Sequence, residues 1–80
     1  MIEENYWLEP AEMILTLREK YYHTYYSLEQ LSYQLGYKMN HSTFSRIVNG
    51  SRKPSFETYQ KIYNLYQYVV ITSPKQIMKT

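Results

Sequence analysis

The sequence predicts a compact all-α domain, a bundle of five helices. Apolar residues recur at intervals of three and four along most of the chain, the spacing of one face of a helix. Residues that start and end helices separate these runs, namely Pro10, Gly36, Asn49-Gly50 and Ser73-Pro74. No segment reads convincingly as a strand. We therefore expect helices packed on a single core.

Length and composition limit the class of protein. The 80 residues, 44% of them hydrophobic, predict a single domain spanning residues 1–80. The absence of cysteine excludes disulfides and thiolate zinc sites. The acidic start Met-Ile-Glu-Glu lacks the basic region of a secretory signal, which favours a cytoplasmic protein. No apolar run approaches the roughly 20 residues that span a bilayer, so no membrane partner is expected.

Catalysis is not expected. The chain has no aspartate, and its two glycines, Gly36 and Gly50, are too far apart to form a phosphate loop. The two histidines, His23 and His41, do not have the spacing of metal ligands and lack clustered carboxylates. We therefore expect no enzyme, no metal and no cofactor.

Positive charge is concentrated in the middle of the chain, although the net charge is only +2. Residues 1–36 contain six glutamates against Arg18 and Lys20. Residues 37–61 contain a single acid, Glu57, and five basic residues: Lys38, Arg46, Arg52, Lys53 and Lys61. Such a local excess suits a surface that faces phosphates, although an ordinary solvated face is the alternative.

The first half of the chain predicts two helices. Pro10 starts a helix over residues 10–22. Residues 21–26, Tyr-Tyr-His-Thr-Tyr-Tyr, are expected to form a linker, with single-strand stacking or a partner surface as the alternatives. Ser27 to Gln30 fits a capping box that opens a second helix, which Gly36 ends. Its apolar face is formed by Leu28, Leu31 and Leu35.

The second half predicts three more helices. Asn40 caps a helix that buries Phe44, Ile47 and Val48, and Asn49-Gly50 ends it. Ser55 caps a fourth helix, and Ser73-Pro74 opens a short fifth helix ending near Met78. The apolar stripe expected on the fourth helix consists of Phe56, Tyr59, Ile62, Tyr63 and Tyr66.

Leu28–Ile62 resembles the DNA-binding domain of the Cro and phage-repressor family, the xenobiotic-response-element type. The resemblance lies in Ser27–Ser32, in Ser42–Ile47 and in Asn49–Ser55, with Leu17-Arg18 matching a pair in the family's first helix. It implies a lambda-repressor-like fold with a helix-turn-helix, whose second helix enters the major groove of DNA. The protein would then be a sequence-specific transcriptional regulator, a repressor of phage, plasmid or mobile-element type.

The resemblance also implies which residues touch DNA. Base edges would be read by His41, Ser42, Ser45 and Arg46, with Thr43 either under the helix or against a thymine methyl. Phosphates would be approached by Ser27, Asn49, Ser51, Arg52 and Lys53, and we add Lys38 and Asn40 at the turn.

The chain departs from the family pattern at three places. The connection from Gly36 to Asn40 is about two residues longer than the family's turn, with Lys38-Met39 as the extra pair, and the linker before Ser27 is longer as well. Val48 replaces a glutamate that commonly pairs with the first-helix arginine. Arg18 is therefore expected to reach solvent, Glu57 or a phosphate.

The expected partners are double-stranded DNA and a second copy of the chain. Family dimers place two recognition helices about 34 Å apart on a palindromic site. The candidate dimer face comprises Tyr63, Tyr66, Tyr68, Val69 and Val70. The alternative is a protein-interaction module on the same fold, such as an antitoxin or an adaptor that binds a host protein.

Overall fold

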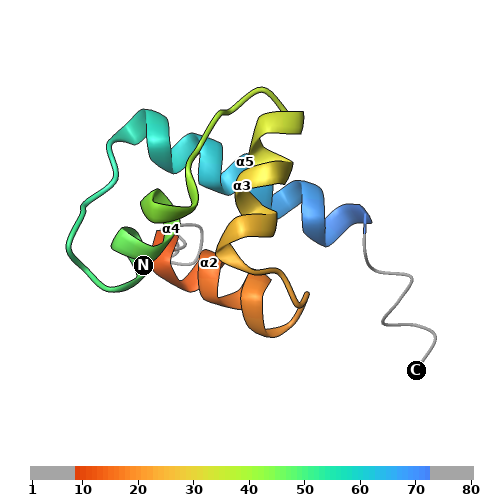
Figure 1. The fold of residues 1–80 in the computed structure, drawn as a ribbon, viewed down its shortest axis with the longest axis horizontal. Helices are drawn as coiled ribbons and strands as arrows, with labels where there is room; N and C mark the ends of the chain where they lie inside the picture. Colours follow the sequence, from red (N-terminus) through yellow and green to blue (C-terminus); the bar gives the residue numbers. More distant parts are fainter. Residues whose placement is uncertain (1–8, 73–80) are drawn as a thin grey trace, which may run out of the picture.

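A computed structural model describes residues 9–72, which form four helices and contain no strand. Helix α2 comprises Pro10–Glu19, α3 Tyr25–Gln34, α4 His41–Val48 and α5 Phe56–Thr72. Helix α2 packs against both α4 and α5, and α3 packs against α4. In Figure 1 the longest helix, α5, runs behind α3, while α2 and α4 lie below α5 in this view. The fifth helix expected near residues 73–78 falls outside the described residues.

Helix α2 starts where the sequence predicts but ends three residues earlier. Pro10 occupies the first turn, where its missing N–H is not needed, and Glu12 lies near the positive end of the helix dipole. The helix ends at Glu19 because Tyr22 adopts a left-handed conformation with φ of 61°. The backbone N–H of His23 then donates to the Leu17 carbonyl at 3.1 Å, which closes the helix end.

Helix α3 begins at Tyr25, so the expected capping box at Ser27 and Gln30 is wrong. Thr24 is the N-cap, its hydroxyl accepts from the Ser27 N–H at 3.0 Å, and the Ser27 hydroxyl accepts from the Thr24 N–H at 2.8 Å. A serine thus fills the third position that glutamate or glutamine usually takes. Arg18 lies 4.5 Å above the ring of Tyr25, so the exposed arginine reaches an aromatic face as well as solvent.

The connection between α3 and α4 is stabilised by its own backbone hydrogen bonds and by a buried side chain. Gly36 has a φ of 88°, and the N–H groups of Gly36 and Tyr37 donate to the Tyr33 and Ser32 carbonyls at 3.1 and 2.7 Å. This pair of bonds is a Schellman motif. Met39, expected as part of an inserted pair, is only 5% exposed and fills the core. The turn therefore contributes to the packing of the domain.

Helix α4 has the predicted bounds but a different cap. Asn40 occupies the N-cap position without a side-chain hydrogen bond to the helix. The Glu29 carboxylate of α3 accepts from the His41 N–H instead, at 3.1 Å. Gly50 ends α4 with a φ of 85° in a second Schellman motif, in which Ser51 N–H donates to the Arg46 carbonyl at 3.0 Å.

One core joins the four helices and the turn. Its buried apolar side chains are Met13, Ile14, Leu17, Leu28, Met39, Phe44, Ile47, Tyr59, Ile62, Leu65 and Val69. Each large side chain among them contributes on the order of 1.5–3 kcal/mol through removal from water.

Three residues differ from their expected positions relative to the core. Phe56 was expected in the apolar stripe of α5 but is 74% exposed, because the first residue of that helix lies beyond the edge of the core. Val69, expected on a dimer face, is buried in the core, whereas Tyr68 and Ile71 beside it are exposed. Val48 is partly buried against the core, as an apolar residue at the edge of α4 would be.

Candidate nucleic-acid interface

The outward face of α4 carries small polar side chains and one arginine. Phe44 and Ile47 turn into the core, which leaves Ser42, Ser45 and Arg46 on the opposite side of the helix. Arg46 is exposed, and its guanidinium has no hydrogen-bond or ion-pair partner among the described residues. Thr43 is half-buried, and its N–H donates to the Asn40 carbonyl at 3.0 Å. The side chains on this face of α4 are therefore accessible to a ligand.

His41, at the start of α4, is bound to α3 on one side. Its Nδ1 lies 2.9 Å from the Glu29 Oε1 atom, the same oxygen that accepts from the His41 backbone N–H. The hydrogen bond from the His41 side chain, followed by that from its backbone, lowers the pKa of Glu29 below its ordinary value. Glu29 is thus a carboxylate at neutral pH.

Tyrosines of α3 lie beside the start of α4. The Tyr26 ring stacks on the His41 imidazole, with ring centroids 4.3 Å apart and planes inclined by 29°. The Tyr33 hydroxyl donates to Asn40 Oδ1 at 3.1 Å. Both tyrosines remain largely exposed, at 65% and 48%. They extend the polar surface around the start of α4 on the side of α3.

The loop after α4 contains an ordered turn. Asn49 Oδ1 accepts from the Ser51 N–H at 3.1 Å and lies 2.9 Å from the Ser51 hydroxyl. These two expected phosphate contacts are therefore partly engaged with each other, although both residues are exposed. The Asn49 amide hydrogens have no partner in the described part of the chain.

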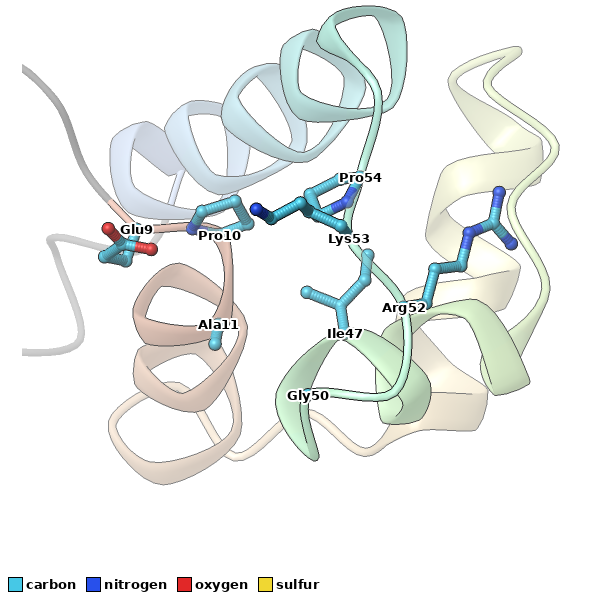
Figure 2. Close-up of a pocket in the computed structure, with 8 residues that line it drawn as sticks. All are labelled: Glu9, Pro10, Ala11, Ile47, Gly50, Arg52, Lys53 and Pro54. Carbon is cyan, nitrogen blue, oxygen red and sulfur yellow. The ribbon is translucent and has the colours of Figure 1, made fainter.

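Arg52 and Lys53 are both exposed but point in opposite directions from the loop, as Figure 2 shows. The Lys53 side chain extends toward Pro10, over a pocket of about 200 Å³ between the start of α2 and the loop. A larger depression of about 520 Å³ adjoins it and includes the exposed Phe56. Arg52 extends away from this pocket. The two cations therefore do not form one cluster.

Two other expected phosphate contacts have different surroundings. Ser27 lies within the capping box, and its hydroxyl is also 2.9 Å from His23 Nδ1, so its polar groups already form hydrogen bonds with neighbouring residues of the chain. Lys38 is exposed in the turn with a φ of 53°. The structure thus brings Ser42, Ser45 and Arg46 together on α4 and leaves Ser27 within the start of α3.

Sequence reasoning did not identify Glu29 and Tyr26 as part of this site. Glu29 is 12 residues from His41, and no local pattern marks the pair. The spacing of Tyr26, Glu29 and Tyr33 at three and seven residues places them on one side of α3, which is the available sequence signal.

In residues 9–72, no group of three or more His, Cys, Asp or Glu side chains could hold a metal ion. None of the four described helices is long and apolar enough to cross a membrane.

Comparisons with known proteins found no match: no protein-family model, curated protein or solved structure is significantly similar to this chain.

Proposed function

We propose that this protein is a sequence-specific DNA-binding transcriptional regulator, in which α3, the turn and α4 act as a helix-turn-helix. The observation that carries the proposal is the outward face of α4, where the unpaired Arg46 lies beside Ser42 and Ser45. An arginine on a helix surface can donate two hydrogen bonds to guanine O6 and N7 in the major groove. The serines can donate or accept, so they discriminate less.

The positive charge around α4 also supports the proposal that this surface binds DNA. Lys38, Arg46 and Arg52 are exposed, and none has an acidic partner among the described residues. Lys61, by contrast, lies 3.9 Å from Glu57. Unpaired cations around an exposed helix attract phosphates and make binding dependent on salt.

The experiment is selection from a randomised duplex library, followed by fluorescence anisotropy on the enriched duplex and a scrambled duplex across a salt series. We expect the enriched duplex to bind more tightly, with Arg46→Ala losing about 1–3 kcal/mol and relaxing the preference at one base pair. Ser45→Ala is the matched control on the same face and is expected to lose less. Equal, weak binding of both duplexes would contradict the proposal.

A homodimer would let two copies of α4 read a palindromic site. In the C-terminal half of α5, the large side chains of Tyr68 and Ile71 are exposed at 43% and 67% and are available for it. Sedimentation of the wild type and Ile71→Glu tests this: the variant should be monomeric if the C-terminal half of α5 forms the contact. A monomeric wild type that still reads its site would rule out this dimer.

A protein-interaction module is the second candidate, favoured by the exposed tyrosines. Tyr22, Tyr26 and Tyr33 have exposures of 87%, 65% and 48%, and tyrosines are enriched at protein interfaces. Charge reversal separates the two functions. Arg46→Glu with Arg52→Glu should abolish DNA binding and leave a partner surface on α3 unaffected.

A further inference from the structure

The first residue of α4 is restrained more than any other side chain on the proposed DNA face. The Glu29 carboxylate holds both the backbone N–H and the Nδ1 atom of His41. The Tyr26 ring covers one face of the imidazole at a centroid distance of 4.3 Å. The His41 side chain nevertheless stays 42% exposed, and its Nε2 atom has no partner in the described chain.

These contacts decide which ring nitrogen carries the proton. Glu29 is ionised and has no hydrogen to donate, so the close contact between Nδ1 and Oε1 requires the hydrogen to be on Nδ1. In the neutral ring this is the only N–H, so Nε2 presents a bare lone pair. The free edge of the neutral His41 ring is therefore an acceptor.

Because Nε2 is an acceptor, it can bind only those base groups that donate a hydrogen bond. In the major groove, donors are offered only by the exocyclic amines of adenine (N6) and cytosine (N4). Guanine O6 and N7, thymine O4 and the phosphate oxygens are all acceptors and would repel the Nε2 lone pair. A hydrogen-bond acceptor held at the first residue of a recognition helix therefore selects bases that carry an amine, adenine and cytosine.

We propose that Glu29 and Tyr26 are positioning residues that hold His41 as the Nδ1–H tautomer, so that its Nε2 reads an adenine or cytosine amine. The inference rests on the proposed function, because it names the base class read at one position of the DNA site. Glu29 also caps α4, so one carboxylate both starts the helix and orients its first reading group.

The tautomer is measured in the free protein by long-range ¹H–¹⁵N correlation at about pH 8, where an imidazole in solution is neutral. His41→Ala assigns the His41 signals against those of His23. We expect the wild type to have a protonated Nδ1 and an unprotonated Nε2. Glu29→Ala should shift the populations toward Nε2–H, and Glu29→Gln should restore the wild-type pattern because its amide oxygen still accepts. A wild-type ring protonated on Nε2 would overturn the proposal.

Base reading is measured on the selected duplex, with each base substituted in turn. The position faced by His41 is the one at which His41→Ala abolishes the preference. We expect the wild type to favour adenine or cytosine there by about tenfold, the value of one good hydrogen bond. Glu29→Ala should lose this preference while keeping the one at the Arg46 position, and Glu29→Gln should retain both. Circular dichroism confirms that each variant is folded.

The outcomes separate this inference from the function on which it rests. A selected duplex whose preferences do not change in His41→Ala, or that favours guanine at the His41 position, overturns the inference and leaves the regulator intact. A library that yields no enriched duplex overturns the proposed function and the base-reading role with it. In that case the tautomer measurement still tests whether Glu29 positions the His41 ring, but nothing more.

Discussion

The hydroxyl of Ser32 in α3 holds the backbone of Met39, the last turn residue but one before α4. It accepts from the Met39 N–H at 3.0 Å and lies 3.0 Å from the Met39 carbonyl oxygen and 2.8 Å from that of Glu29. Ser32 is fully buried and Met39 nearly so. A single small side chain therefore satisfies buried backbone groups of the turn and sets where α4 begins relative to α3.

Ser32→Ala should lower the free energy of unfolding by about 1–3 kcal/mol, because it leaves the buried Met39 N–H without a partner. Urea unfolding followed by circular dichroism measures the change. Ser42→Ala, at a position outside the core and on the outer face of α4, is the control and should stay within about 0.5 kcal/mol of the wild type. Equal changes in the free energy of unfolding for the two variants would show that the hydrogen bonds of the Ser32 hydroxyl do not stabilise the fold.

Tyr22→Gly should stabilise the protein by about 1 kcal/mol, since a left-handed backbone costs an ordinary L-residue about that much or more. The Tyr22 φ is 61°, and its side chain is 87% exposed, so little packing is lost with the ring. Thermal unfolding measures the gain. Tyr22→Ala removes the same ring without relieving the backbone, and a glycine variant no more stable than the alanine variant would contradict this account.

Stability should fall as the pH is lowered from neutral. Burial lowers the pKa of the half-buried His23 from its ordinary value of 6.5, so between the folded and unfolded pKa values the unfolded chain binds more protons. The stability due to neutral His23 is therefore present above pH 6.5 and is lost as the pH falls toward the folded pKa. Hydrogen bonds from His41 lower the pKa of Glu29 from 4.5, so its contribution is lost at more acid pH.

Urea unfolding of the wild type, His23→Gln and Glu29→Gln over this range measures the two contributions separately. We expect His23→Gln to flatten the dependence just below pH 6.5, and Glu29→Gln to flatten it below pH 4.5. Unchanged slopes in both variants would assign the acid sensitivity to other groups.

Arg52→Gln and Lys53→Gln should affect DNA binding unequally, because their side chains leave the loop in opposite directions (Figure 2). Lys53 extends over the pocket beside Pro10, so we expect Arg52 to make the larger phosphate contribution. Loss of a phosphate contact should weaken all sequences similarly and reduce the salt slope by about one. The salt dependence of each variant measures this, and equal reductions would place both cations at the phosphates.

Local signals predicted where most helices lie. Pro10, Gly36 and Gly50 mark helix ends through backbone preferences that need no tertiary contact, and the structure confirms all three. The bounds of α4 follow in the same way from its strongly one-sided apolar pattern. The start of α3 was misplaced because Tyr25 and Tyr26 are mediocre helix formers, and their contacts with Arg18 and His41 outweigh that preference.

For residues 9–72 the sequence by itself determined an all-helical fold, the starts of α2 and α4, the helix ends at Gly36 and Gly50, and the polar face of α4, because these depend on residue type and on spacing within a few positions. Only the tertiary structure decided that Glu29 caps α4, that Met39 fills the core, and that Val69 belongs to the core. It also decided that Phe56 is exposed. Each of these depends on which surfaces the packed helices bring together, over separations that no periodic pattern encodes.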